Sequence, residues 1–346
     1  MKKIFLIALL AIGWGACKKS GSPAGSNGTD TKTVLSVSAP EQGFIYLDGS
    51  YTGIKAPGKI SASRGKHIIG IALQPSFQYL RKEINVGTDS TISLTAADAP
   101  PPKTWKALWI GLNETTGTTP GGMCSTHFTV NELDEAYNFF EWSLREHMEK
   151  YTYHTIHWEV ERKDIVAPVT LTESGSGRYT AEPGTISGLL PQIQPGVYDC
   201  VFVFWREKEG TCNFSSNYFG LAWTNPMSEN IKTGYVTVKF DAANSLTERI
   251  NYYKTNDPGV WIHEWLHTVG ENFYQSRGKQ LPRKAGDGLV VHAAEMYNYK
   301  FPWMDWYQDF IAGRVVNVYD GPRYLGIGPE AFLDCPLRET AVNNCH

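Results

Sequence analysis

The amino-acid sequence predicts a multidomain protein, in which a small all-β sandwich precedes a larger α+β domain. The chain has 346 residues, which is enough for two or three domains. Residues 33–97 alternate apolar and polar side chains in short runs that Gly, Pro, Asp and Ser interrupt, as expected for β-strands. Residues 105–346 mix strand-like runs with segments of helical periodicity, which predicts the α+β domain.

The composition favours a folded protein and argues against nucleic acid as a partner. The chain is 42% hydrophobic and 19% charged, with a formal net charge of −3. These values are typical of globular proteins rather than disordered ones. A near-neutral chain without basic runs is not typical of a nucleic-acid-binding protein. The eleven tryptophans and eighteen tyrosines either fill the core or form a recognition surface for sugars or extended peptides.

The N-terminus predicts an exported protein. Lys2 and Lys3 precede a short apolar segment, residues 4–12, which is too short to span a membrane as a mature helix. Two small residues then come directly before Cys17. This arrangement resembles the signal of bacterial lipoproteins, which implies that Cys17 is lipidated and becomes the new N-terminus. The alternative is an ordinary secretory signal with a chance cysteine.

The lipoprotein resemblance determines the expected location. Residues 1–17 are the signal segment, and residues 18–32 are rich in Gly, Ser and Lys, which predicts a flexible tether. We therefore expect an exported protein that a lipid anchor holds on the membrane, at the outer membrane or cell surface of a bacterium.

Five cysteines follow the lipidation site, and export permits them to form disulfides. They are Cys124, Cys200, Cys212, Cys335 and Cys345. The sequence predicts that Cys200 pairs with Cys212 across a hairpin and that Cys335 pairs with Cys345 in a C-terminal loop. An odd number leaves at least one cysteine free or paired outside the chain. Because no Cys-x-x-Cys pair is present, a structural zinc site made of cysteines is not expected.

The stretch within residues 33–97 resembles a PEGA-type domain. Such domains carry a strand that ends in Asp-Gly, a second Gly, a Pro, and then Gly-Lys/Arg-His before another strand. The corresponding residues here are Asp48, Gly49, Gly53, Pro57, Gly65 and His67. The resemblance implies a surface spacer or a binding module, with a structural role for His67. Residues 98–104 contain three prolines and predict a semi-rigid linker to the larger domain.

The stretch VWIHEWLHTVGENF, residues 260–273, carries the clearest chemical signal. His263 and His267 lie four residues apart, so on a helix they share one face and can bind one metal ion. Glu264 directly follows the first histidine. The competing interpretation is an ordinary helix whose histidines bond to core carbonyls while Glu264 is exposed. A buried Glu264 would need a partner, which favours the metal site.

Helix-capping signals surround this motif. Asp257 and Pro258 suit the cap and first position of a helix, and Gly270 suits its end. We therefore expect one helix between Asp257 and Gly270 that carries the motif.

The motif His263-Glu264-x-x-His267 resembles that of the zincin metallopeptidases. The resemblance implies that the two histidines bind Zn²⁺ and that Glu264 activates a zinc-bound water as general base. Zinc lowers the pKa of such a water from 15.7 towards about 7 and polarises the carbonyl under attack. The spacing is what hydrolytic zinc chemistry requires.

The identity of the third zinc ligand would decide which subclass of zincins the chain resembles. The metzincin pattern requires a glycine three residues after the second histidine, and Gly270 fits. It also requires a ligand three residues later, where this chain has Phe273, which cannot bind metal. The metzincin extension therefore fails.

The remaining candidates lie in a later segment. A third histidine, His292, with Glu295 behind it is the preferred arrangement, since imidazole is the commonest protein ligand for zinc. In the gluzincin alternative, Glu295 itself is the ligand. Glu271 is a weaker choice, because it lies at the expected helix end.

Three further features are expected near the site. The phenol of Tyr297 or Tyr299 would stabilise an oxyanion, with aromatic packing as the alternative. Met304 would form a floor under the metal as in metzincins, with core packing as the alternative. By analogy with zincins, residues 218–223 (YFGLAW) would form an edge strand that pairs with an extended substrate.

Together these features predict a cell-surface zinc metallopeptidase that hydrolyses peptide bonds in a protein or glycoprotein substrate. One alternative is a surface lipoprotein of zincin fold that binds glycan or protein without catalysis, and another is a different zinc hydrolase. An intact Glu264 favours catalysis, because a binding protein has no need of a general base.

Overall fold

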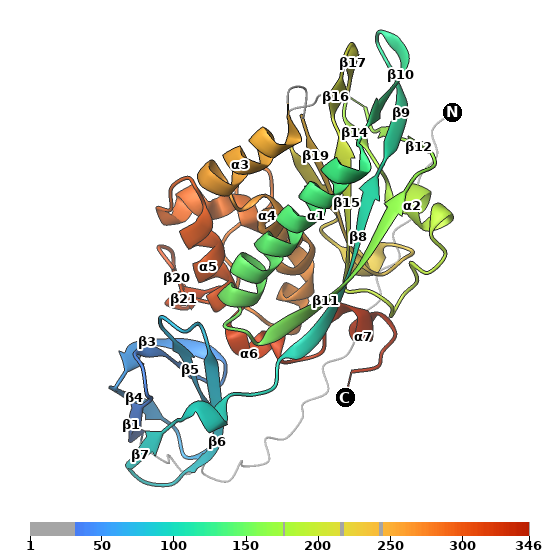
Figure 1. Cartoon of the computed structure of the whole chain (residues 1–346). Coiled ribbons are helices and arrows are strands. Elements are labelled where there is room, and N and C mark those ends of the chain that lie inside the picture. Colours follow the sequence, from blue (N-terminus) through green and yellow to red (C-terminus); the bar gives the residue numbers. More distant parts are fainter. Residues whose placement is uncertain (1–31, 176, 215–217, 242–244, 346) are drawn as a thin grey trace, which may run out of the picture.

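The computed structural model describes residues 32–175, 177–214, 218–241 and 245–345 of a mixed α/β protein (Figure 1). Cys17, the signal segment and nearly all of the predicted tether lie outside these residues. Within the described ranges, no helix is both long and apolar enough to cross a membrane. We refer below to residues 32–102 as the N-terminal unit and to the rest as the C-terminal unit.

The N-terminal unit consists of two sheets that enclose a common set of apolar side chains. Leu35, Ile45 and Ile71 are fully buried there and come from both sheets. The first sheet has the order β4-β1-β7 and the second the order β3-β2-β5-β6. The strands are β1 (Thr33–Ser38), β2 (Gly43–Leu47), β3 (Ser50–Ala56), β4 (Gly58–Ala62), β5 (Gly65–Leu73), β6 (Tyr79–Val86) and β7 (Ser90–Ser93).

A tight turn joins β2 to β3 at the Asp-Gly pair of the PEGA-like stretch. Asp48 and Gly49 both have positive φ, 49° and 74°, as the favoured hairpin turns require. The Asp48 carboxylate accepts a hydrogen bond from the Ile68 amide (2.8 Å) and lies 2.7 Å from Nδ1 of His67. His67 therefore holds this turn in place, in keeping with the structural role expected for it.

A five-stranded sheet organises the C-terminal unit. Its order is β11-β8-β15-β19-β18, in which the first four strands are parallel and β18 is antiparallel at one edge. The strands are β8 (Lys103–Leu112), β11 (Ile156–Ile165), β15 (Cys200–Arg206), β18 (Gly220–Ala222) and β19 (Gly234–Phe240). The prediction of an edge strand within residues 218–223 is therefore confirmed. Since β8 begins at Lys103, the linker ends two residues earlier than predicted.

Helices cover one face of this sheet, with α1, α3 and α4 together in Figure 1, while α2 lies on the other side. Trp261 of α4 packs between Phe140 of α1 and Phe202 of β15. The helices are α1 (Val130–Ser143), α2 (Pro183–Leu189), α3 (Leu246–Asn256), α4 (Val260–Thr268), α5 (Met304–Ala312), α6 (Pro329–Phe332) and α7 (Leu337–Ala341). The short strands are β9 (Glu114–Thr119), β10 (Gly122–His127), β12 (Val169–Thr170), β13 (Thr172–Glu173), β14 (Tyr179–Thr180), β16 (Lys208–Glu209), β17 (Cys212–Asn213), β20 (Val315–Val316) and β21 (Tyr324–Leu325).

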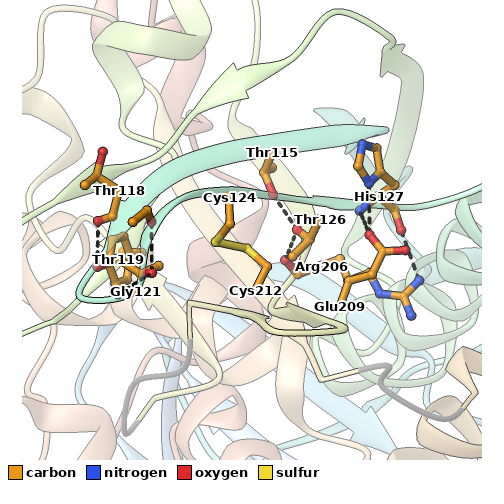
Figure 2. Close-up of a disulfide and its surroundings, with 12 residues drawn as sticks. Thr115, Thr118, Thr119, Gly121, Cys124, Thr126, His127, Arg206, Glu209 and Cys212 are labelled. Atoms are coloured by element: carbon orange, nitrogen blue, oxygen red, sulfur yellow. Dashed lines mark hydrogen bonds and ion pairs between the residues drawn. A yellow bond between two sulfur atoms is a disulfide. The ribbon is translucent and has the colours of Figure 1, made fainter.

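The structure confirms one of the two predicted disulfides. Cys335 pairs with Cys345, but Cys212 pairs with Cys124, and Cys200 is buried and free. Cys200 opens the seven-residue strand β15, and the hairpin that carries Cys212 follows the other end of that strand, about 20 Å away. The disulfide instead joins β10 to β17, as Figure 2 shows. Disulfides are typical of oxidising compartments.

The two units contact each other directly. The Tyr46 hydroxyl donates to the carbonyl of Ala312 at the end of α5 (2.8 Å), and Arg81 pairs with Glu330 of α6 (2.7 Å). Glu330 also accepts a hydrogen bond from the Tyr79 hydroxyl (3.0 Å). These contacts join β2 and β6 of the first unit to the helices of the second.

A histidine buried near the end of α1 makes the stability of the protein depend on pH. His147 lies on a π-helical segment, Leu144–Glu149, with its ring beside Trp142 (5.0 Å) and Tyr151 (5.6 Å). No side chain among the described residues hydrogen-bonds to either ring nitrogen. Burial lowers the pKa of His147 to about 4, from the usual 6.5.

We expect His147→Phe to reduce the loss of stability in mild acid. The pKa of His147 is lower in the folded state than in the unfolded state. Its contribution to stability is therefore fully present above pH 6.5 and is lost as the pH falls towards about 4. The free energy of unfolding lost by this group at pH 5 is about 2 kcal/mol. Urea unfolding at pH 7 and pH 5 measures it. The control is His154→Asn, which replaces an exposed histidine. Its φ of 55° is one that asparagine tolerates, so this variant should keep the pH dependence of the parent. An unchanged pH dependence in His147→Phe would contradict this assignment.

Candidate metal centre

Helix α4 carries the motif and packs almost entirely inside the protein. Trp261, Trp265 and Leu266 are fully buried on it. The capping prediction is wrong, because Asp257 ends α3 and Gly259 is the residue before α4. A Cβ at Gly259 would lie 2.5 Å from the Tyr307 ring, so only glycine permits this close approach of α4 and α5.

The helical path does not end at Gly270 as predicted. It continues as a π-helical turn over Val269–Phe273. A Cβ at Gly270 would lie 2.8 Å from the ring of Phe310, so this glycine allows α5 to pack closely. The extra turn places Glu271 on the same side as the motif histidines.

Three histidines from two segments converge with their Nε2 atoms. His267 Nε2 and His292 Nε2 each lie 3.2 Å from His263 Nε2. His292 lies on a 3₁₀-helix, Val290–Tyr297, that begins well after α4 in the sequence. The three ligand atoms lie within 4.8 Å of one another, close enough to hold a metal ion.

Each of the three rings has an oxygen atom at its other nitrogen. Tyr307 Oη lies 2.8 Å from Nδ1 of His263, and Glu271 Oε1 lies 3.3 Å from Nδ1 of His267. The Asp287 carboxylate contacts Nδ1 of His292. When Nε2 binds a metal, Nδ1 carries the proton and donates it to such an oxygen, which fixes the ring orientation. All three rings are therefore arranged as metal ligands.

Glu271 connects the two segments that carry the histidines. Besides contacting His267, its carboxylate accepts hydrogen bonds from the amides of Val290 (2.8 Å) and Val291 (3.0 Å). These amides open the 3₁₀-helix of His292. Glu271 is therefore a positioning residue rather than the third ligand that the sequence left open.

The alternative ligand, Glu295, lies away from the cluster. It is exposed on the 3₁₀-helix, and among the described residues it does not belong to the group of side chains close enough to hold a metal ion. His292 completes the group of three side chains instead, and Asp287, which the sequence analysis did not single out, contacts its other ring nitrogen. The segment forms a 3₁₀-helix rather than the α-helix that a gluzincin-type glutamate would require.

Glu264 lies between the histidines and the edge strand. It is only 3% exposed, and burial raises its pKa to about 8. Its carboxylate makes no hydrogen bond or ion pair with any residue that the structure describes, so the carboxylate is available to a bound molecule. A Cβ at Gly220 of β18 would lie 2.6 Å from Glu264 Oε1, so glycine at this strand position makes room for the carboxylate.

The electrostatic surroundings favour the neutral form of His263. Burial lowers the pKa of His263 well below its usual value, and the neighbouring His267 and His292 lower it further. The neutral form of imidazole is the one that binds metals.

Other residues predicted near the site have different partners. Tyr297 Oη accepts the amide of Arg283 (2.6 Å), and the Tyr299 hydroxyl donates to Asp309 (2.8 Å). Both phenol oxygens are therefore engaged elsewhere, and both rings pack against Trp306, in agreement with the alternative of aromatic packing. Met304 packs beside Gly259 at the start of α4. Two other aromatic rings lie beside His263, those of Phe219 and Tyr307, each with its centroid 5.8 Å from the His263 ring.

The edge strand leaves backbone groups free next to Glu264. In the antiparallel ladder, the Lys239 amide bonds to the Phe219 carbonyl (2.9 Å), and the Trp223 amide bonds to the Tyr235 carbonyl (3.0 Å). Because inward and outward residues alternate, the backbone groups of Gly220 and Ala222 point towards the open edge.

The comparisons with known proteins identify no relative: no protein-family model, no curated protein and no solved structure matches the sequence. The structure itself shows three histidines close enough to hold a metal ion in a mixed α/β protein.

Proposed function

We propose that the protein is a zinc metallopeptidase of zincin type. The observation that carries this proposal is the convergence of His263, His267 and His292 beside Glu264, whose carboxylate has no partner among the described residues. Sites with three histidine ligands and an open fourth position are typical of catalytic zinc. Zn²⁺ bound there would polarise a carbonyl and lower the pKa of a water molecule.

The chain's own residues would supply the remaining steps. Glu264 would accept the proton of the attacking water and pass it to the leaving amine, as a general base and then a general acid. An extended peptide would pair with the outward backbone groups of Gly220 and Ala222. Since Gly220 touches the Glu264 carboxylate, this pairing would bring a peptide bond next to the general base.

Metal analysis of the purified protein tests the proposal. We expect about one equivalent of zinc, which His263→Ala and His267→Ala should each abolish. We also expect cleavage of extended peptides that 1,10-phenanthroline stops and added zinc restores. Zinc content unchanged in both variants would exclude the metal site. A zinc-loaded protein that cleaves no peptide would favour the non-catalytic binding protein or a different hydrolase.

We further propose that the protein is a surface lipoprotein whose N-terminal unit is a PEGA-type sandwich. The two disulfides support an oxidising compartment. We expect Cys17→Ser to move the protein from the membrane fraction to the soluble fraction, because it removes the lipid attachment site. Equal thermal unfolding of both proteins is the control for folding. A variant that stays in the membrane fraction would refute the lipid anchor.

A further inference from the structure

A crevice lies where the two units meet, away from the metal centre residues. Its volume is about 510 Å³, within the range of about 300–1,000 Å³ typical of ligand pockets. Residues 48–52 of the β2–β3 turn line one side, and residues 277–280 and 322–327 line the other. In Figure 1 this is the place where β3 lies next to β20 and β21.

The crevice concentrates positive charge on a protein whose formal net charge is −3. Its basic residues are Arg277, Lys279 and Arg323, and its one acidic residue is Asp48. The Asp48 carboxylate is already engaged by His67 and by the Ile68 amide. None of the three basic residues forms an ion pair with any residue that the structure describes. The lining of the crevice therefore carries more positive than negative side chains.

Lys279 is the most informative of these residues. It is half-buried, and burial lowers the pKa of its ammonium group. Its Nζ reaches across to the N-terminal unit, where a Cβ at Gly49 would lie 3.7 Å away. The nearby Glu330 carboxylate is bound to Arg81 and Tyr79. The other carboxylate near Lys279 is that of Asp334, and neither Asp334 nor Glu330 forms an ion pair with it among the described residues. A half-buried cation that lacks a direct ion pair would stabilise an anion bound here.

The remaining lining suits an organic molecule. Tyr51 and Tyr324, one from each unit, lie with their ring centroids 4.6 Å apart. Ser50, Thr52 and Gln280 add polar groups beside them. Aromatic rings with nearby hydrogen-bonding groups are typical of sites that hold amphipathic small molecules.

We propose that this crevice binds a small organic anion, whose carboxylate or phosphate group pairs with Lys279 and Arg323 while its body contacts Tyr51 and Tyr324. The ligand bridges the two units, because each unit supplies part of the lining. A sugar acid and a sugar phosphate share this chemistry. The proposal does not depend on the metal centre, and its test uses no activity measurement.

Titration of the full-length protein, followed by thermal unfolding and calorimetry at constant ionic strength, tests the site. The probes are glucuronate, glucose 6-phosphate, neutral glucose and inorganic phosphate. We expect a saturable rise in Tm with glucuronate or glucose 6-phosphate, none with glucose, and weaker binding of inorganic phosphate. Which of the two organic anions binds more tightly distinguishes a carboxylate from a phosphate ester.

Substitutions then assign the effect to the crevice. Lys279→Met should weaken binding of the organic anion at least about tenfold, since it removes a charge-assisted contact. Arg323→Gln changes an exposed residue, so it should fold normally and also weaken binding. Lys284→Met, at an exposed lysine nearby, is the matched control and should bind as the parent does. The absence of saturable binding by both organic anions would overturn the proposal. Equally tight binding of inorganic phosphate, or equal binding by Lys279→Met and Lys284→Met, would also overturn it.

Discussion

Replacing Glu264 by glutamine should abolish peptide hydrolysis and leave the zinc content unchanged. The amide has nearly the shape of the carboxylate, so the contact with Gly220 is kept. It cannot accept a proton, however, and general acid–base catalysis typically contributes about 10²–10⁴-fold to the rate. Because burial already disfavours the charged form of Glu264, the neutral amide should not destabilise the metal-free protein. The measurement is kcat on a peptide substrate together with metal content.

The control applies the same substitution to an exposed residue. Glu295→Gln changes an exposed glutamate on the 3₁₀-helix that is not among the side chains close enough to hold the metal, so its kcat should equal that of the parent. If Glu264→Gln retained the parent rate with full zinc content, another residue would have to be the general base. Loss of both activity and zinc would instead indicate that Glu264 supports the metal site.

The sequence predicted those parts of the site that depend on local spacing. His263 and His267 face the same way because residues four apart lie on one side of a helix, and Glu264 follows from the same motif. The capping box at the start of α1 is an equally local feature: the Thr129 hydroxyl accepts a hydrogen bond from the Glu132 amide (3.2 Å), and the Thr129 amide donates to the Glu132 carboxylate (2.8 Å). In these cases the interacting residues lie within one turn of each other.

The residues behind the ligands could not be predicted, because their contacts arise from tertiary packing. Tyr307 reaches His263 only because Gly259 lets α5 approach α4 closely. Glu271 reaches the amide of Val290 only because a π-helical turn extends α4. No periodicity in the sequence marks either feature.

The disulfide error has a similar cause. Cys200 and Cys212 are close in sequence, which suggested a hairpin pair, but β15 runs in parallel between β8 and β19. The chain therefore turns back only after the end of β15, and Cys212 meets Cys124 of a hairpin much earlier in the sequence. A strand at the centre of a parallel sheet differs from a hairpin strand in its partners, which a single sequence does not reveal.

The third histidine provides the most direct test of how the metal is held. We expect His292→Ala to weaken zinc binding by several kcal/mol, because it removes one of three ligand atoms. Asp287→Asn should weaken it about 10–100-fold, since the residue behind a ligand acts only by orienting the ring and raising its basicity. Glu295→Gln should have no effect. Competition with a chromophoric chelator measures the three affinities on one scale.

The order of these effects decides between the two arrangements left open by the sequence. If Glu295→Gln weakened zinc binding more than His292→Ala did, the metal would be held by a carboxylate, as in the gluzincin pattern. The structure argues for the opposite order on two grounds. His292 Nε2 lies 3.2 Å from His263 Nε2, and Glu271 holds the start of the His292 segment through two amides. Because Glu271 also contacts His267, its replacement by glutamine should disturb two ligands at once and weaken zinc binding more than Asp287→Asn.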